Sequence, residues 1–408
     1  MRRTGRRLII FDDGRGRLGP MTDLRASFEV RTGVMTTAGR LAAAFPRRLD
    51  GYWVPAPLAA LVAERANAPV NRLPDEEVLL LANGRWARPD DGPDLEPGEA
   101  WIEASTGDVI CAVMRRADAG YFLETGELPE RIRTTTADER RLYRHPWDIL
   151  PDLRATIVHD LEQLPMMNDA TVGRDVAQVV GDAPLLIHRS ATIGANVVFD
   201  VTAGPILVQE DAVIRHGAIL VGPVSIGPRS MVADRSIIKA GTVIGRDCKV
   251  GGEIGSTIFQ GCANKVHDGH LGDSWIGKWS NLGAGTTNSN LLNTYGDVVV
   301  RTEVDGPRHR TGLTFCGAFV GDHVKAAIGT RIMTGTVLGT GAMVARSTPP
   351  PATVPRFAWL TDDGERIFRV EKFLEVARTV MGRRGRTASA AYEARVVALH
   401  GERTGVVS

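Results

Sequence analysis

Glu253, His267 and His270 carry the side chains needed for acid–base chemistry within one short segment. Glu253 precedes His267 by fourteen residues, and His270 follows three residues later. An imidazole titrates near neutral pH and can take a proton from an attacking amine or hydroxyl, while a carboxylate can orient it. The following stretch Gly283-Ala284-Gly285 offers backbone N–H groups for an oxyanion. This combination predicts acyl transfer from a thioester.

Two other interpretations compete for these polar residues. Three imidazoles can hold zinc, but His216 lies far from His267 and His270 in sequence, and the three show no recognisable ligand spacing. Asparagines and glycines also supply turns with positive φ, which is the interpretation we favour for Asn288. The glutamate and the two histidines exceed what turns require, so they remain the candidate site.

The elements around these residues follow a six-residue period. Eight aliphatic residues recur at this interval: Val208, Ile214, Leu220, Ile226, Val232, Ile238, Ile244 and Val250. A second series follows: Val320, Ala326, Ile332, Leu338 and Val344. A period of six fits neither an amphipathic helix nor an alternating strand. It predicts a parallel β-helix of hexapeptide repeats, in which each short strand buries one aliphatic side chain.

The β-helix is expected over residues 185–348, interrupted between about 252 and 318, where the period is lost and the polar residues gather. Insertions in repeat proteins collect on one face, which is often the binding face. Pro349-Pro350-Pro351 are expected to stop the coil. Residues 349–408 then form a helical tail, with Ile367, Val370, Leu374, Ala377 and Met381 at helical spacing.

Residues 1–165 predict an α/β domain, joined to the β-helix by a linker over 166–184. Strands are expected at 8–11, 78–82 and 109–114, with helices near 36–45, 56–66 and 147–163. This alternation suggests a wound, Rossmann-type parallel sheet. Arginines crowd the first forty residues, either as a solvated terminus or as a site for phosphates: Arg2, Arg3, Arg6, Arg7, Arg15, Arg17, Arg25, Arg31 and Arg40.

Composition excludes several classes of protein. The net charge of the 408 residues is +1, so the chain as a whole is no trap for nucleic acid. Cys111, Cys248, Cys262 and Cys316 form no disulfide framework. The apolar run 8–11 is too short for a signal peptide or a membrane span. We therefore expect a cytoplasmic protein with no membrane partner.

Long motifs now allow a family resemblance to be stated. The phrases FQGCANKVHDGHLGDSWIGKWSNLGAGTTNSNLLNTYG, FVGDHVKAAIGTRIMTGTVLG and IIFDD…LGPMTDLRASFEVRTGVMT resemble the bifunctional N-acetylglucosamine-1-phosphate uridyltransferase/glucosamine-1-phosphate N-acetyltransferase family, and more closely a divergent GlmU-like branch with a short N-terminal domain. The resemblance implies a left-handed β-helix, a homotrimer with active sites between subunits, acetyl-CoA as cosubstrate, and an amino sugar phosphate or nucleotide sugar as acceptor in UDP-N-acetylglucosamine-type biosynthesis.

The resemblance also implies roles for single residues of the β-helix. His267 falls at the general base and Glu253 at its carboxylate partner, while Asn281 matches a residue that touches the amino-sugar phosphate. Ala284 and Asn290 match residues at the acetyl-CoA thioester, next to Gly285 of the oxyanion stretch. Three positions depart from the family: Gly255 replaces a phosphate-binding lysine, His270 a tyrosine of the sugar site, and Asp322 a serine near the coenzyme. His270, Arg235 and Lys265 are candidates for the missing positive charge.

The first domain resembles the family through its glycine-rich loop at residues 13–22, in which Arg15 and Arg17 would hold a nucleotide triphosphate. A family lysine is Ser27 here, so Arg25 and Arg31 are candidates for its role. The Gly-Asp that holds Mg²⁺ in the family is Gly84-Arg85, and arginine cannot coordinate a cation. Either the metal is held elsewhere, with Asp12 and Asp13 as candidates, or this domain binds nucleotide-like ligands without transferring them.

These departures leave two alternatives to a fused acetyltransferase. One is a sugar-phosphate nucleotidyltransferase whose β-helix only oligomerises it. The other is a non-catalytic scaffold that binds nucleotide sugars. The Glu253/His267 pair favours acetyl transfer over both, and Gly84-Arg85 disfavours the first.

Overall fold

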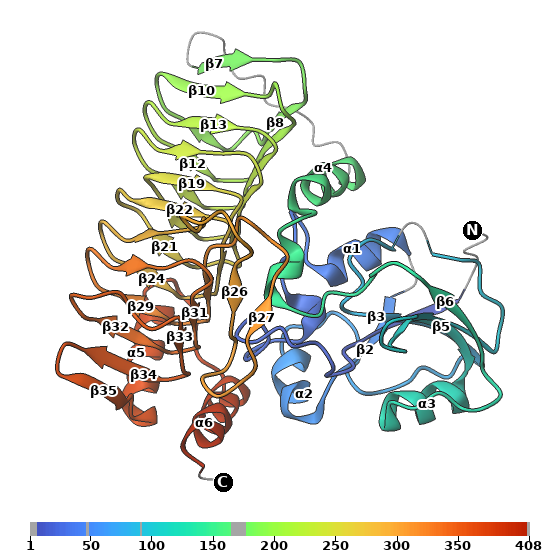
Figure 1. Ribbon diagram of the computed structural model, residues 1–408. Helices are drawn as coiled ribbons and strands as arrows, with labels where there is room; N and C mark the ends of the chain where they lie inside the picture. Colours follow the sequence, from blue (N-terminus) through green and yellow to red (C-terminus); the bar gives the residue numbers. More distant parts are fainter. Residues whose placement is uncertain (1–5, 46–48, 90–91, 165–176, 406–408) are drawn as a thin grey trace. The chain divides into compact units, whose positions relative to one another are not determined.

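The computed structural model describes residues 6–45, 49–89, 92–164 and 177–405 (Figure 1). Arg2, Arg3 and residues 166–176 of the expected linker lie outside these ranges. The chain divides into two compact units. The first contains Leu24–Asp148 and the segment up to Leu18, and the second contains Ile149 onward together with Gly19–Asp23.

The first unit is built on one six-stranded sheet with the order β2-β1-β3-β5-β4-β6. Its strands are β1 (Arg7–Phe11), β2 (Leu49–Trp53), β3 (Val78–Asn83), β4 (Glu99–Glu103), β5 (Val109–Arg115) and β6 (Arg133–Ala137). Its helices are η1 (Ser27–Glu29), α1 (Thr37–Ala44), α2 (Ala56–Ala63) and α3 (Arg116–Thr125). The three expected strands and the two expected helices of this unit are present.

The sheet is Rossmann-like but mixed, not wholly parallel as expected. β1 runs parallel to β2 and β3, whereas β5 runs antiparallel to both β3 and β4. The connection from β4 to β5 spans only residues 104–108, with Gly107 at φ +73°. A parallel crossover needs a dozen residues or more, so this short turn forces an antiparallel hairpin.

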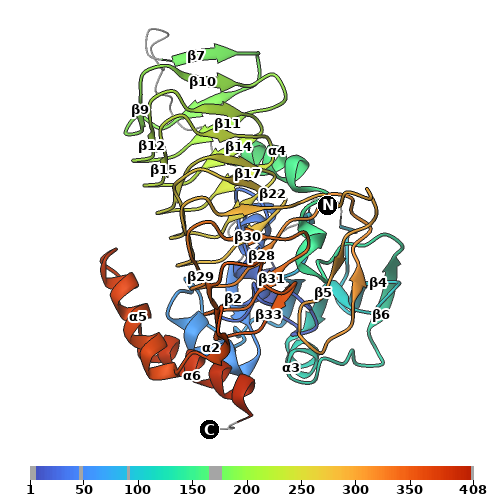
Figure 2. The same cartoon turned by 60° about the vertical axis from the view of Figure 1, so that its left-hand side comes forward.

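The second unit is a β-helix, which confirms the expectation from the six-residue period (Figures 1 and 2). From β7 to β24, successive strands fall in turn on three sheets, and each strand pairs in parallel with the strand three further along. Every aliphatic residue of both predicted series is buried inside these coils. Corner residues adopt left-handed backbone angles, such as Asp211 at φ 54° and Asp247 at φ 57°. The left-handed sense of the coil remains an expectation from the family resemblance.

We designate the three sheets by one strand of each, as the β19, β20 and β21 sheets. The β19 sheet contains β7 (Ala177–Val180), β10 (Val197–Asp200), β13 (Ile219–Val221), β16 (Ile237–Ile238), β19 (Glu253–Gly255) and β22 (His270–Gly272). The β20 sheet contains β8 (Leu185–Ile187), β11 (Ile206–Val208), β14 (Val224–Ile226), β17 (Thr242–Ile244), β20 (Ile258–Phe259), β23 (Trp275–Ile276), β28 (Phe319–Val320), β31 (Val337–Leu338) and β33 (Thr353–Val354). The β21 sheet contains β9 (Thr192–Ile193), β12 (Val213–Ile214), β15 (Met231–Val232), β18 (Lys249–Val250), β21 (Asn264–Lys265), β24 (Asn281–Leu282), β29 (Lys325–Ala326), β32 (Met343–Ala345), β34 (Ala358–Thr361) and β35 (Gly364–Ile367).

The expected interruption between 252 and 318 is wrong over its first half. The coils continue through β19 to β24 and reach β25 (Thr287–Asn288), which pairs with β30 (Arg331–Ile332). The chain leaves the coil only after Asn288, forms the antiparallel hairpin of β26 (Val299–Val300) and β27 (His309–Arg310), and returns at β28. The site residues therefore lie on regular coils of the β-helix.

The expectation that Pro349–Pro351 stop the coil is also wrong. β33 and β34 follow the prolines and pair in parallel with β31 and β32, so one further coil is added. The tail then forms α5 (Val370–Gly382) and α6 (Ala390–Thr404), which contact one another (Figure 2). Leu374, Ala377 and Met381 are buried on α5 as their spacing predicts, whereas Ile367 lies in the edge strand β35 and is exposed.

The expected helix at 147–163 appears as the short helix η3 (Pro146–Ile149) followed by α4 (Leu153–Gln163). α4 belongs to the second unit, since that unit begins at Ile149. None of the helices within the described residues is long and apolar enough to cross a membrane.

Candidate active site

Glu253 and His270 lie side by side on the β19 sheet. The two residues are register partners in β19 and β22, on adjacent coils. Glu253 Oε1 lies 3.3 Å from His270 Nδ1, and both side chains are about one-third exposed, at 38% and 34%. A carboxylate at Nδ1 fixes the tautomer of the ring and leaves Nε2 for a second partner. The structure thus brings together two of the predicted site residues.

Lys239 adds a cation to the same carboxylate. Its ammonium contacts Glu253 Oε1 and, as the largest cause, lowers the pKa of Glu253 by hydrogen bonding to it. Lys239 directly follows β16, one coil before Gly255. A Cβ placed on Gly255 would lie 3.3 Å from Lys239 Cβ and 3.6 Å from its Cδ. The lysine stem therefore lies over the position at which the family lysine is missing. Sequence reasoning missed Lys239, because a coil partner sixteen residues away has no local signal.

Asn290 and Asp273 continue this polar row beyond His270. Asn290 Nδ2 donates to Asp273 Oδ2 at 2.6 Å, and burial raises the pKa of Asp273. A Cβ placed on Gly272 would lie 2.7 Å from both His270 Nε2 and Asn290 Nδ2. The imidazole of His270 therefore lies between Glu253 and Asn290, and a side chain at position 272 would displace one or both of its neighbours.

His267 lies at a corner of the coil, away from this row. Its side chain is exposed and lines a cavity of about 510 Å³ together with Arg215, Asp234, Arg235 and Gly252. Among the described residues, no hydrogen bond or ion pair joins the side chains of His267 and Glu253. The expected pairing of this imidazole with that carboxylate is therefore replaced, within one chain, by the contact between Glu253 and His270.

Lys265 holds the turn that carries His267. It occupies an interior position in β21, in register with Val250, and is 1% exposed. Its ammonium donates to the backbone oxygens of Gly251 at 3.0 Å, His267 at 2.8 Å and Asp268 at 2.9 Å. Burial lowers its pKa to about 8. This lysine is committed to carbonyl groups inside the coil, so it is not available as the missing phosphate ligand.

Ala284 and Gly285 form the corner of the next coil, stacked on the turn of His267. A Cβ placed on Gly269 would lie 2.2 Å from Thr286 O and 3.5 Å from the carbonyl carbon of Gly285. Gly285 has φ +69°, and Gly329 N donates to Ala284 O at 2.7 Å. The turn that carries the predicted base and the corner that carries the predicted oxyanion stretch thus lie next to one another on adjacent coils.

Two further positions have structural roles. Asn288 is buried, with its amide bonded to the backbone N and O of Gly272 at 2.8 and 2.9 Å. It fills an interior position of the coil and is structural, as favoured, although not as a turn residue. Asp322 is 3% exposed, and its Oδ1 accepts from Lys278 N at 2.8 Å.

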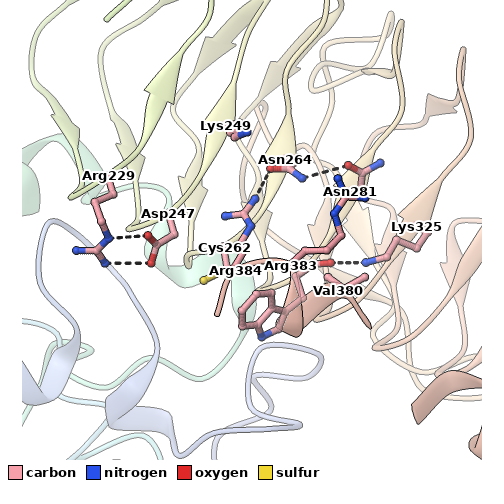
Figure 3. A pocket seen from close by; sticks show the side chains of 11 residues that line it. Arg229, Asp247, Lys249, Cys262, Asn264, Asn281, Lys325, Val380, Arg383 and Arg384 are labelled. Carbon is pink, nitrogen blue, oxygen red and sulfur yellow. Dashed lines mark hydrogen bonds and ion pairs between the residues drawn. The ribbon is translucent and has the colours of Figure 1, made fainter. Parts of the chain in front are cut away.

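Asn281 lies on the outer face of the β21 sheet and lines a second cavity of about 760 Å³ (Figure 3). Asn264 Nδ2 donates to Asn281 Oδ1 at 3.4 Å. Asn281 is thus separated from Glu253, His270 and Asn290, which belong to the neighbouring face.

In the first unit, Arg85 binds Asp13, one of the two carboxylates that were candidates for a magnesium site. Its guanidinium is fully buried and bonds Asp13 through Nε at 3.0 Å and Nη2 at 2.5 Å. Nη2 also reaches Asp108 Oδ2 at 2.8 Å, and Nη1 donates to Tyr143 O at 3.1 Å. Burial is the largest single influence on the pKa of Asp13 and raises it, but the charge and hydrogen bonds of Arg85, together with the hydrogen bonds from Asn83 and Arg15 N, lower the pKa below its ordinary value.

The carboxylates of this loop do not fit a magnesium ion. Asp13 also accepts from Arg15 N at 3.0 Å and from Asn83 Nδ2 at 2.9 Å. Asp12 accepts from Gly14 N at 3.0 Å and from Ser27 N at 2.7 Å, and burial raises its pKa. All four oxygens already accept from the protein. Throughout the described part of the chain, no three His, Cys, Asp or Glu side chains are grouped to hold a metal.

The three arginines predicted for the first unit lie in different environments. Arg15 lines a cavity of about 490 Å³ with Asp12 and Asp13, and its guanidinium bonds Asp108 at 3.2 Å and Gly126 O at 2.9 Å. Arg17 is exposed, and Arg25 is 2% exposed. Of these, only Arg15 lines the cavity.

Residues 8–166 match the family described as sugar nucleotidyl transferase. The first domain is therefore similar to sugar nucleotidyl transferases over these residues. A bifunctional sugar-1-phosphate nucleotidylyltransferase/acetyltransferase of Sulfurisphaera tokodaii is 32% identical over 139 residues, which is 34% of each chain. The bifunctional protein GlmU of Clavibacter sepedonicus is 32% identical over 154 residues, 36% of this chain and 27% of that protein. The chain thus matches about a third or less of the length of these relatives, and it resembles the bifunctional family at low identity.

Comparison with solved structures gives only weak similarities. A mutant of GDP-perosamine N-acetyl transferase from Caulobacter crescentus, in complex with CoA and GDP-perosamine, is 14% identical and covers 88% of this chain and 96% of that chain, with a TM-score of 0.17. A putative acetyltransferase of Bacillus cereus is 12% identical and covers 56% and 98%, also with a TM-score of 0.17. Scores this low do not establish a common fold.

Proposed function

We propose that the protein is a transferase that moves an acetyl group from acetyl-CoA to the amine of an amino sugar phosphate or nucleotide sugar. The observation that carries this proposal is the polar row on the β19 sheet, where His270 lies between Glu253 and Asn290. The turn of His267 and the corner of Ala284 and Gly285 stack beside one another at one edge of the coils. The matches to bifunctional nucleotidylyltransferase/acetyltransferases support the same chemistry.

In the proposed reaction the acceptor amine attacks the thioester carbonyl carbon. The new C–N bond forms, the C–S bond breaks, and the His267 imidazole takes the amine proton and returns it to the departing thiolate. Backbone N–H groups of the Ala284–Gly285 corner stabilise the oxyanion that develops on the carbonyl. Lys265 is a positioning residue in this scheme, since its ammonium fixes the backbone on which His267 is carried.

Glu253, His270 and Lys239 form the acceptor side of the site. Glu253 and Lys239 present a carboxylate for the amine and a cation for the phosphate, and Glu253 also orients His270. In this proposal Asn290 contacts the thioester, which is the role that the resemblance implies for it. A homotrimer with this site between subunits is part of the proposal, because the residues of the row and of the corner are at least partly exposed in the single chain.

The test is release of free thiol from acetyl-CoA with a panel of amino sugar phosphates. His267→Ala should lower the rate by about 10²–10⁴-fold while the oligomer stays intact. His188→Ala, at a partly exposed coil position remote in sequence from the site, is the matched control and should retain full activity. Normal turnover by His267→Ala would exclude this residue as the base.

For the first domain, we propose binding of a nucleotide-like ligand without nucleotidyl transfer. The support is that Arg85 binds Asp13 and Asp108, while both oxygens of Asp12 accept hydrogen bonds from the backbone. A nucleoside triphosphate and a sugar phosphate should therefore yield no pyrophosphate. Pyrophosphate release that is lost in Arg17→Ala would contradict this proposal and favour the nucleotidyltransferase alternative.

A further inference from the structure

The cavity of about 760 Å³ on the β21 sheet is strongly cationic. Five basic side chains line it, against one carboxylate: Arg229, Lys249, Lys325, Arg383 and Arg384, with Asp247. Both oxygens of Asp247 are taken by Arg229, at 2.8 and 3.1 Å (Figure 3). The remaining four cations face the cavity with no carboxylate among the lining residues to balance them. A cavity of this volume is in the range that holds a small-molecule ligand.

The cations come from two separate parts of the second unit. Lys249 and Lys325 project from strands β18 and β29 of the β-helix, whereas Arg383 and Arg384 follow the end of α5. Cationic side chains at the end of a helix also interact with its dipole, which accounts for the two arginines. The dipole of α5 does not account for Lys249 and Lys325, which lie on strands. A second cause is therefore needed for the two lysines and the two arginines to line the same cavity.

Hydrogen-bonding groups lie among these charges. Arg384 donates through Nη2 to Asn264 Oδ1 at 2.6 Å, and Asn264 in turn donates to Asn281 (Figure 3). Lys325 contacts the backbone oxygen of Trp279, and burial lowers its pKa to about 8. A buried ammonium beside an arginine is costly, and a bound anion would offset that cost.

We infer that this cavity binds a diphosphate-bearing small molecule through Lys249, Lys325, Arg383 and Arg384. Arginine forks and lysine ammonium groups are the side chains that hold phosphate oxygens most strongly. Four cations spread over two elements match two linked phosphates better than one. The ligand class includes the diphosphate of a coenzyme and that of a nucleotide sugar. None of the four cations belongs to the polar row of the β19 sheet. Binding of a diphosphate in this cavity can therefore be tested independently of acetyl transfer.

Cys262 gives a direct readout of occupancy, because it lines this cavity and is partly exposed while the other three cysteines are buried. Burial raises the pKa of its thiol, so alkylation will be slow and is best followed at mildly alkaline pH. Inorganic pyrophosphate should slow alkylation of Cys262 in the full-length protein by about tenfold at saturation. Cys262→Ser identifies the labelled site by mass spectrometry.

Binding of pyrophosphate is then measured by calorimetry in charge-removing variants. Lys249→Ala and Arg383→Ala, both at exposed side chains, should each weaken binding by about tenfold, the loss expected for one charged hydrogen bond. Arg366→Ala, exposed on β35, is the matched control and should bind as the wild type does. CoA and UDP-N-acetylglucosamine are tested as competitors, and displacement by either one supports the inference and identifies the source of the diphosphate.

Several outcomes would overturn this inference. One is an alkylation rate of Cys262 that pyrophosphate does not change. Another is pyrophosphate binding that is lost in Arg17→Ala but retained in Lys249→Ala, because this would place the anion in the first domain. Displacement of pyrophosphate by neither competitor would exclude a diphosphate-bearing ligand of this class.

Discussion

Glu253 Oε1 lies 3.3 Å from His270 Nδ1, and the histidine at the predicted base position, His267, is carried by a different corner of the coil. We therefore propose different roles for His270, which contacts Glu253, and for His267, which does not. Glu253 can orient only the ring that it contacts, and in this chain that ring belongs to His270.

His270→Gln tests this separation. If His270 acts on the acceptor, the KM for the amino sugar should rise by about tenfold while kcat changes little, because binding is lost without loss of the base. Steady-state kinetics of His270→Gln and His267→Gln, measured in parallel, give the comparison. A collapse of kcat in His270→Gln, with His267→Gln near normal, would assign proton removal to His270.

Lys239→Ala should raise the KM for a phosphorylated acceptor by about tenfold, since one charge-assisted contact is removed. The pKa of Glu253 should return toward its ordinary value, because the Lys239 hydrogen bond is the largest cause that lowers it. The double variant Lys239→Ala/Gly255→Lys returns a cation to the neighbouring coil. Recovery of the KM is expected there after a small shift at the 3.3 Å contact between the two Cβ positions.

Arg85→Ala should destabilise the first unit by about 3–5 kcal/mol, because Asp13 and Asp108 would be left buried without their cation. Chemical denaturation followed by fluorescence measures the change. Arg15→Ala is the control, since its half-exposed guanidinium makes a surface-like pair with Asp108 and should cost no more than about 1 kcal/mol. Equal losses in the two variants would contradict the central role of Arg85.

Lys325 should make the stability of the second unit depend on pH. Burial lowers its folded-state pKa to about 8 from 10.5, so the unfolded chain binds more protons between these values and stability rises with pH across this window. Lys325→Met lacks this titration. The difference in Tm between wild type and Lys325→Met should therefore shift in favour of the wild type from pH 8 to 10.5, and a constant difference would show that the ammonium is not penalised.

The sequence was sufficient to predict the coils wherever the spacing is regular, as from Val208 to Val250. It failed between Val250 and Asn288 because the interior positions Ile254, Phe259 and Lys265 follow at intervals of four, five and six residues. Shortened corners break the period, and a buried lysine and a buried asparagine conceal two interior positions. Only pairing between coils reveals that the fold continues.

The site was predicted in composition but not in arrangement. Glu253, His270 and Asn290 were recognised from local motifs, and the structure places them in one row. Lys239 was not recognised, because its contact with Glu253 joins residues fourteen apart with no shared motif. Arg85 and Asp13 are seventy-two residues apart, so their pairing could not be inferred from sequence.

The stem of Lys239 covers Gly255 because equivalent positions in successive coils are stacked in columns. In such an architecture, a side chain at the equivalent position of a neighbouring coil can project its head group into the same solvent-facing space. Repeat proteins are therefore better compared between stacked positions than along the chain alone, because the lysine stem beside Gly255 belongs to a residue sixteen positions earlier in the sequence.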